Sequence, residues 1–367
     1  MALKHKNTMS LTFHPLKVKN IRRETADCVS VALAVPASLA ATFQFKQGQY
    51  LTFKKDFNGT ELRRSYSICS SPLDGELRVA IKQVEAGIFS TYINNELKVG
   101  DELATMAPQG LFTTQLDEQQ HKHYVAIAAG SGITPILSII KTVLQTEPHS
   151  QVSLIYGNKS RGSIIFKNEI EDLKNRYMER ISVYHILSRE QADTELMNGR
   201  IDAAKCAYFF EKVIDPKSIS EAFLCGPEEM IMNAKDALIQ AGVPEANVHY
   251  ELFFSSIAAQ KQEARKAAAA NDDSMSQVSI TLDGSTTVLQ LGYHGISILD
   301  AALNSGADLP FACKGGVCAT CRCKIESGEV EMDVNYSLEK DEVANGFVLA
   351  CQAHPRSEQV VVNFDVR

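Results

Sequence analysis

The sequence contains no apolar run of the kind that a targeting signal or a membrane span requires. Met1–Phe13 lacks the apolar core of about 7–15 residues that marks a secretory signal peptide. The most apolar stretch, Tyr124–Ile140, is interrupted by Gly130, Gly132 and Pro135 and is too short to span a bilayer comfortably. We therefore expect a cytoplasmic protein without membrane contact, and its nine cysteines suit a reducing compartment.

The sequence also lacks an excess of basic charge. The 367 residues carry a net charge of −7, with twelve acidic and six basic residues from Gln277 onward and 32 against 31 before it. This balance disfavours nucleic acid as a partner and suits docking of an acidic C-terminal region to a positively charged protein. A solvated surface without any partner would give the same pattern.

Internal repeats and long low-complexity tracts are absent, and three successive patterns divide the chain instead. Thr12–Phe112 contains short alternating runs separated by turn residues, including Asn58-Gly59 and Asp74-Gly75, which predict tight hairpins in an antiparallel β-barrel. From Tyr124 onward strands alternate with helices, which predicts a doubly wound α/β domain. The expected organisation is a barrel at 10–115, an α/β domain at 120–255, a tether at 256–276 and a third domain at 277–367.

Four cysteines of the third domain carry the pattern of an iron–sulfur site. Cys313, Cys318 and Cys321 stand at C-x4-C-x2-C, and Cys351 follows after a longer gap. This is the spacing of plant-type [2Fe–2S] ferredoxins. Two glycines between the first two cysteines free the loop from Cβ crowding, so that its N–H groups can point at cluster sulfurs. The sequence therefore predicts a [2Fe–2S] cluster in a β-grasp (α+β) ferredoxin domain.

Other uses of these cysteines fit the pattern less well. Structural zinc sites usually show two separated cysteine pairs, or a cysteine pair with a histidine pair, and the sequence has neither. A Rieske centre would need histidines in two motifs, whereas His354, three residues past Cys351, is the single candidate. Cys323 is then a spare thiol, expected to point away from the cluster on the strand that leaves the loop.

Two short motifs in the barrel favour a flavin nucleotide. In Arg64-Ser65-Tyr66-Ser67 the tyrosine can lie against a flat ring while the arginine pairs with phosphate. Gly87-Ile88-Phe89-Ser90 then looks like a helix start, which offers backbone N–H groups to a pyrophosphate. Either motif alone is weak, because a barrel tyrosine is usually part of the core. Their order upstream of a nucleotide-binding pattern resembles that of the ferredoxin–NADP reductase superfamily.

The superfamily's G-x-G-x-x-P loop is matched by Gly130-Ser131-Gly132-Ile133-Thr134-Pro135, at a strand-to-helix turn. Such glycines let the backbone approach the pyrophosphate of a nicotinamide dinucleotide. Ser188 and Arg189 come just after the predicted strand Ile181–Leu187. A hydroxyl and a guanidinium at this position can bind the 2′-phosphate of NADPH, whereas an acidic residue would bind the ribose hydroxyls of NADH. We therefore expect NADPH in preference to NADH, although the acidic Glu190 follows directly and counts against this interpretation.

The resemblance also implies a site for hydride transfer. Cys225-Gly226-Pro227 matches the superfamily's C-G-P element, whose cysteine lies beside the nicotinamide ring. Glu251 and Phe253 resemble the end of the nucleotide domain, where an acid and an aromatic residue face the flavin. Without the resemblance, Cys225 would be interpreted as a small buried hydrophobic residue.

The number of electrons that each cofactor transfers explains why these sites occur in one chain. A nicotinamide gives up two electrons as a hydride, whereas one [2Fe–2S] cluster cycles by one, and a flavin can accept the pair and release single electrons. The order FAD, nucleotide, ferredoxin is shared by several oxygenase reductases.

At closer range the chain resembles the reductase components of bacterial phenylacetyl-CoA epoxidases, through Cys313–Lys324, Gly328–Tyr336 and Asn345–Pro355. The resemblance implies electron transfer from NADPH through FAD and [2Fe–2S] to a separate di-iron oxygenase, which epoxidises the aromatic ring at carbons 1 and 2. Two alternatives stay open. One is the reductase of a ring-hydroxylating dioxygenase or another di-iron monooxygenase. The other is a non-enzymatic iron–sulfur carrier or redox sensor, against which the intact flavin and nucleotide motifs argue.

Overall fold

The computed structural model describes residues 12–192, 194–253, 265 and 274–366. The chain divides into two compact units, Met1–Glu251 and Leu252–Arg367, and each is described by itself below. The tether expected at 256–276 falls largely outside the described residues. Within the described residues, no helix is long and apolar enough to cross a membrane.

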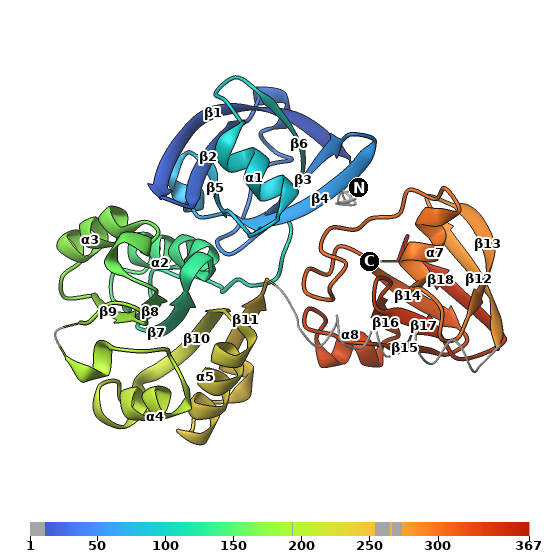
Figure 1. Cartoon of the computed structure of the whole chain (residues 1–367). Coiled ribbons are helices and arrows are strands. Elements are labelled where there is room, and N and C mark those ends of the chain that lie inside the picture. The colour runs from blue at the N-terminus through green and yellow to red at the C-terminus, as the bar shows by residue number, and fades with distance from the viewer. Residues whose placement is uncertain (1–11, 193, 254–264, 266–273, 367) are drawn as a thin grey trace, which may run out of the picture. The chain divides into compact units, whose positions relative to one another are not determined.

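The first unit begins with a six-stranded antiparallel sheet in the order β4-β3-β6-β1-β2-β5 (Figure 1). Alternating apolar residues such as Leu16, Val29 and Phe53 fill the inside of this barrel. Helix α1 packs beside β5 and carries Phe89 and Ile93 into the same core. The elements are β1 (Phe13–Thr25), β2 (Cys28–Ala34), β3 (Tyr50–Phe57), β4 (Thr60–Ser67), β5 (Leu77–Lys82), α1 (Ile88–Asn95) and β6 (Glu102–Met106).

The two predicted hairpin turns have different outcomes. Asn58 and Gly59 adopt φ values of +54° and +83° and join β3 to β4, which confirms the first prediction. The second prediction is wrong, because Asp74 ends a 3-10 helix, Pro72–Asp74, and Gly75 follows it in the left-handed region. Ser71 accepts a hydrogen bond from Leu73 N, and the Asp74 carboxylate accepts one from Ser71 N, so this capping box stabilises the helical turn.

The second part of this unit is a five-stranded sheet in the order β11-β10-β7-β8-β9, with parallel pairing from β10 to β9. Helices α2 and α3 cover one face and α4 and α5 the other (Figure 1), as in a doubly wound fold. The elements are β7 (His123–Ala129), α2 (Ile133–Thr146), β8 (Gln151–Asn158), α3 (Lys167–Arg176), β9 (Ile181–Leu187), α4 (Ala203–Lys212), β10 (Ile219–Gly226), α5 (Glu228–Gln240) and β11 (Val248–Leu252).

The barrel and the α/β domain share a hydrophobic core. Cys28, Cys69 and Ala80 of the barrel belong to the same buried cluster as Ile133 and Leu137 of α2. Apolar burial of this kind stabilises the junction without fixing its geometry. Polar contacts at the junction, described below, add that directionality.

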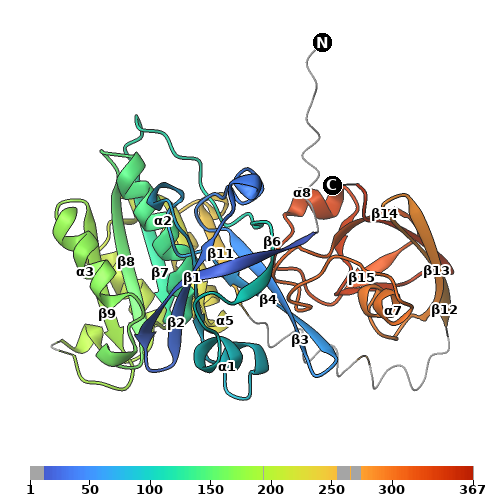
Figure 2. The same cartoon turned by 90° about the horizontal axis from the view of Figure 1, so that it is seen from above.

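The second unit is an α+β domain built on a five-stranded sheet in the order β13-β12-β18-β14-β16, with a separate β15-β17 pair (Figure 1). Figure 2 shows helix α7 beside strand β13. Strand β12 begins at Met275, two residues earlier than the predicted domain start, because Met275 and Ser276 pair with Gly292 and Leu291 of β13. The elements are β12 (Met275–Leu282), β13 (Ser285–Gly292), α7 (Ile298–Asn304), β14 (Arg322–Ser327), β15 (Val330–Met332), α8 (Lys340–Ala344), β16 (Phe347–Leu349), β17 (Ala353–Pro355) and β18 (Gln359–Asn363).

Candidate functional site

The Arg64–Ser67 motif forms the end of β4. The Tyr66 ring lies 5.9 Å from that of Phe53 and 6.2 Å from that of Phe89, the second residue of α1. Burial raises the pKa of the Tyr66 phenol, so the hydroxyl stays protonated. The Arg64 side chain is exposed and donates from Nη1 to Arg63 O at 2.7 Å, while Ser65 Oγ bonds Thr52 Oγ1 at 3.0 Å. The motif thus presents a cation beside a half-buried aromatic ring.

The predicted phosphate-binding helix start is formed by Gly87 and α1. Gly87 is the N-cap and offers no side chain to the first-turn N–H groups. Ser90 Oγ instead accepts from Val84 N at 3.1 Å and donates to Gly87 O at 3.2 Å, which fixes the turn before the helix. Ile88 is 58% exposed, whereas Phe89 is buried against the barrel. The uncapped N-terminus is suited to an anionic group.

The predicted nucleotide loop joins β7 to α2. Gly130 has a φ of +54°, and its carbonyl accepts a hydrogen bond from the Tyr156 hydroxyl at 3.0 Å. The Thr134 hydroxyl donates to Ser131 O at 3.0 Å, and Pro135 is buried in the first turn of α2. The backbone of this strand-to-helix turn is therefore held by a hydrogen bond from β8 and by another from the first turn of α2.

The structure brings this loop against the C-G-P element. A Cβ on Gly132 would lie 2.1 Å from Cys225 O, so only glycine allows this approach. Cys225 is the last residue but one of β10 and is fully buried, and its pKa is raised by burial and by the charge of Glu251. A Cβ on Gly226 would lie 3.2 Å from the Ala129 N and Cβ atoms, and Pro227 is the N-cap of α5.

Glu251 connects this part of the α/β domain to the barrel. Its Oε2 accepts a hydrogen bond from the Ser67 hydroxyl at 3.1 Å. Burial raises the pKa of Glu251 to about 7, and the bond from Ser67 only partly opposes the shift. Phe253 follows β11 and is 44% exposed. The structure thus gathers the end of the barrel motif, Cys225 and the predicted acid at one junction.

The predicted 2′-phosphate residues lie where β9 ends. Ser188 N and Arg189 N donate to Asn158 O at 2.9 Å and Lys159 O at 2.8 Å, and both side chains are exposed. The neighbouring Glu190 forms hydrogen bonds with Arg161, from the backbone N and from Nη1, both at 2.8 Å. Arg161 therefore compensates the carboxylate that the sequence placed beside the proposed phosphate position.

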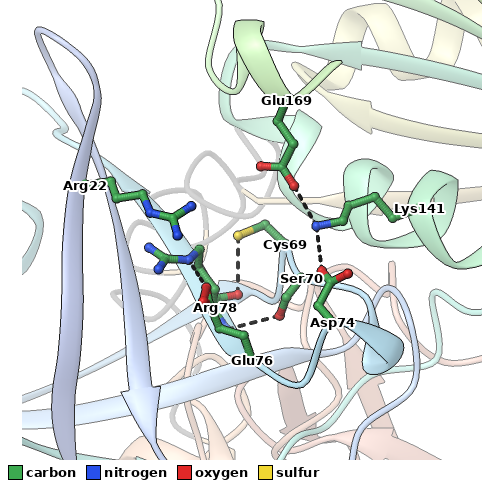
Figure 3. A pocket seen from close by; sticks show the side chains of 8 residues that line it. All are labelled: Arg22, Cys69, Ser70, Asp74, Glu76, Arg78, Lys141 and Glu169. Carbon is green, nitrogen blue, oxygen red and sulfur yellow. Dashed lines mark hydrogen bonds and ion pairs between the residues drawn. The ribbon is translucent and has the colours of Figure 1, made fainter. Parts of the chain in front are cut away.

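A set of polar residues on α2 was missed by the sequence analysis. Ser138, Lys141, Thr142 and Gln145 contact the segment Ser70–Asp74 that follows the barrel motif. Their helical spacing of three, four and seven residues on an otherwise apolar helix was the available signal. A cavity of about 180 Å³ adjoins this contact (Figure 3).

The four predicted ligand cysteines lie together at one end of the second unit. The thiol of Cys313 is close enough to those of Cys318 and Cys351 to shift its pKa, and Cys351 and Cys321 stand in the same relation. Gly315 N donates to Cys313 Sγ at 3.3 Å, as predicted for an N–H group aimed at a cluster sulfur. These thiols fit a [2Fe–2S] cluster, which takes four thiolates.

In the loop that carries Cys313, Cys318 and Cys321, three residues adopt left-handed backbone conformations: Lys314 (φ +53°), Gly316 (+75°) and Ala319 (+49°). A Cβ on Gly316 would lie 2.8 Å from Val334, so the loop is packed closely. Among the described residues, no set of three or more His, Cys, Asp or Glu side chains surrounds a position for one metal ion. A [2Fe–2S] cluster requires no such set, because each iron takes two cysteines.

The remaining thiol and histidine of this region are packed in the core. Cys323 is fully buried on β14, and its Sγ contacts Val348 O at 3.8 Å, as expected for a thiol directed away from the cluster. His354 is buried on β17 and pairs through Nε2 with Asp333 Oδ2 at 3.1 Å. Both residues have structural partners within the domain.

Comparisons with known proteins identify the family. Family models describe residues 15–114 as an oxidoreductase FAD-binding domain, 126–236 as an oxidoreductase NAD-binding domain and 280–356 as a 2Fe-2S iron–sulfur cluster binding domain. A component of the 1,2-phenylacetyl-CoA epoxidase from Escherichia coli is 46% identical over 97% of this chain and 99% of that protein. The chain belongs to this family of oxygenase reductase components.

Two further matches agree with this assignment. The ferredoxin reductase component of 3-ketosteroid-9-alpha-monooxygenase from Mycobacterium tuberculosis is 33% identical over 95% of each chain. Among solved structures, phthalate dioxygenase reductase matches 96% of this chain and 98% of its own, with a TM-score of 0.59 and 20% identity, which supports the fold alone. The predicted fold class, the oxidoreductase activity and the cofactors FAD, nicotinamide dinucleotide and [2Fe–2S] are confirmed.

Proposed function

We propose that this reductase passes electrons from NADPH, through FAD and the [2Fe–2S] cluster, to a separate di-iron oxygenase that epoxidises the ring of phenylacetyl-CoA. The observation that carries this proposal is the 46% identity with the Escherichia coli epoxidase component over nearly the full length of both chains. A second candidate is the reductase of another oxygenase, since a steroid monooxygenase component is 33% identical over a similar span. The higher identity favours the epoxidase.

The barrel motifs are the proposed FAD site, within the proposed FAD domain at 10–115. When bound, FAD would supply the chemistry that accepts two electrons as a hydride and releases them one at a time to the cluster. Tyr66, held against Phe53 and Phe89, offers a ring face, and the exposed Arg64 offers a charge for phosphate. The uncapped N-terminus of α1 at Gly87 supports a pyrophosphate position.

Cys225, Glu251 and Phe253 are the proposed residues around the reacting rings. Cys225 and the Gly130–Pro135 loop are in contact, so a nicotinamide held by the loop would lie beside the cysteine. Below pH about 7 Glu251 holds a proton, and it bonds to Ser67 of the flavin motif. The acid is therefore positioned to exchange a hydrogen bond with groups on both sides of the junction.

Ser188 and Arg189 are the proposed 2′-phosphate ligands, which makes NADPH the proposed donor. Their exposed side chains follow β9 at the carboxyl edge of the parallel sheet, where nucleotides bind in this class of fold. Glu190 would repel a phosphate, but Arg161 compensates its charge. That pairing supports NADPH more strongly than the sequence did.

The proposed cluster ligands are Cys313, Cys318, Cys321 and Cys351, in a ferredoxin domain that corresponds to the proposed 277–367. Their mutual contacts support this assignment. We place the protein in the cytoplasm, because nine cysteines without a disulfide, four of them proposed iron ligands, suit a reducing compartment.

The test is reconstitution. The purified chain, loaded with FAD and containing iron and acid-labile sulfide, is mixed with NADPH and either a phenylacetyl-CoA-epoxidising oxygenase or a steroid-hydroxylating one. We expect NADPH-dependent product with the first and much less with the second. Equal support of both oxygenases would contradict the specific partner, and absence of flavin reduction by NADPH would contradict the electron route.

A further inference from the structure

One face of α2 is joined to the barrel by side-chain hydrogen bonds. Ser138 Oγ donates to Ser70 O at 2.7 Å, and Thr142 Oγ1 lies 3.1 Å from Ser71 Oγ. Ser71 Oγ in turn donates to Gln145 Oε1 at 2.8 Å. The donors and acceptors of this contact are largely buried, so each unmade bond would leave a costly unsatisfied group. We call these residues, together with Lys141 and Asp74, the interdomain seam.

Lys141 adds charge to the interdomain seam. Its Nζ lies 2.5 Å from Asp74 Oδ2 of the barrel and 2.5 Å from Glu169 Oε1 of α3 (Figure 3). Burial alone would lower the pKa of Lys141, but the two carboxylates outweigh burial and raise it. The ammonium therefore stays charged and connects one carboxylate of each domain.

The adjacent cavity of about 180 Å³ does not indicate a further ligand. Its lining includes the basic Arg22, Arg78 and Lys141 and the acidic Asp74, Glu76 and Glu169, so the charges balance. Arg78 pairs with Glu76, and Lys141 pairs with the other two carboxylates. The notable property of this region is the connection that it makes between two domains.

Both ends of the interdomain seam continue directly into proposed cofactor motifs. Ser70 lies three residues after Ser67, the end of the flavin motif, and α2 begins at the Gly130–Pro135 loop. A shift of α2 along the barrel would therefore move the nucleotide loop relative to the flavin motif. The shared apolar core is non-directional and would tolerate small shifts of this kind more easily than hydrogen bonds would.

We propose that the interdomain seam positions the nicotinamide loop against the flavin motif and so sets the distance for hydride transfer. This inference rests on the proposed hydride route. Reacting atoms must approach to about 3–3.5 Å, and a misplacement of about 1 Å can cost a hundredfold in rate. Ser138, Lys141 and Asp74 are then positioning residues, which act through the loop and the flavin motif without touching either ring.

The test compares two neutralising substitutions of Lys141's partners. Asp74→Asn removes the charge that reaches across the seam, while Glu169→Gln removes the equivalent charge inside the α/β domain. Flavin reduction is followed by stopped-flow absorbance at saturating NADPH. We expect Asp74→Asn to slow it about tenfold or more, with an increased isotope effect when the transferred hydrogen is deuterium, and Glu169→Gln to leave it within about twofold. Nucleotide Kd and FAD content should stay unchanged in both.

Ser138→Ala is the second variant, because it deletes one seam bond without touching any charge. If Asp74→Asn binds FAD poorly or unfolds, the rate of flavin reduction in Ser138→Ala tests the positioning role instead. Equal reduction rates in wild type, Asp74→Asn and Ser138→Ala would overturn the inference, as would a loss confined to nucleotide affinity. Failure of the proposed hydride route would look different, because NADPH would then not reduce the wild-type flavin either.

Discussion

The cluster loop and the proposed hydride site are built in opposite ways. The loop takes three of its four proposed ligands, Cys313, Cys318 and Cys321, from nine consecutive residues. The hydride site draws Ser67, Cys225 and Glu251 from three separate segments of the chain, one in the barrel and two in the α/β domain. Local backbone geometry holds the first site, whereas tertiary contacts hold the second. Loss of one ligand should therefore abolish cluster binding completely, whereas single substitutions around the hydride site should lower its rate or affinity only in part.

The largest effect is expected at the cluster. Cys351→Ser should abolish the cluster, because a serine hydroxyl is a poor substitute for a thiolate ligand of iron. Cys323→Ser is the matched control, since that thiol is also buried but points into the core. Iron and sulfide analysis with visible absorbance checks both. Retention of the cluster in Cys351→Ser and its loss in Cys323→Ser would mean that the fourth ligand is misassigned.

Separation of the two compact units should divide the activities. A chain that ends at residue 264 keeps the FAD and nucleotide motifs and should still reduce ferricyanide with NADPH. It should reduce cytochrome c poorly and support no oxygenase turnover, because both require the cluster.

Adding the second unit as a separate chain should restore turnover only weakly. A short covalent connection provides an effective concentration of about mM, which a dilute free domain cannot match. Full oxygenase turnover by the shortened chain alone would contradict the cluster as the electron exit.

The nucleotide pocket should respond gradually. Arg189→Ala should raise the KM for NADPH by roughly ten- to a hundredfold, since a charged hydrogen bond contributes about 1.5–3 kcal/mol, and should change the KM for NADH little. Arg176→Ala, an exposed arginine at the end of α3, is the control. Steady-state kinetics with both nucleotides measures the difference, and equal changes in the two KM values would rule out a 2′-phosphate role.

The smallest effect concerns Glu251. Its pKa is about 7 in the folded chain against an ordinary value of 4.5, so the folded state binds the proton more tightly than the unfolded state. Stability from this group is therefore greatest below pH about 4.5 and falls as pH rises toward about 7. Glu251→Gln does not titrate, so its melting temperature should exceed that of the wild type increasingly across this window, by roughly 2–4 °C for each kcal/mol. FAD-free protein should be compared at several pH values, and parallel melting curves would contradict the shift.

The contrast between local and long-range contacts also explains which features could be predicted from the sequence. The cysteine spacing, the Gly130–Pro135 loop and the Asn58-Gly59 turn are contiguous, so their residues specify the local geometry directly. Asp74-Gly75 has equally strong turn residues, but Ser71 and Asp74 form a capping box and produce a helical turn instead. A residue pair can belong to more than one turn type, and its neighbours decide between them.

Long-range pairs were beyond the sequence for a different reason. Lys141 meets Asp74 across 67 residues, and Glu190 meets Arg161 across 29. A charge in a sequence has many possible partners, and only the folded chain selects one. For this reason Glu190 counted against NADPH in the sequence, although its charge proves to be compensated in the structure.

The contact between Gly132 and Cys225 has a consequence for how such proteins diverge. The glycine has an ordinary φ, so a larger residue is barred there only because Cys225 O would lie 2.1 Å from its Cβ. A lineage that replaced Gly132 would have to shift the end of β10 as well, and with it the cysteine. We therefore expect the two motifs, which are 93 positions apart in the chain, to change together, so that substitutions at Gly132 and around Cys225 covary among related sequences.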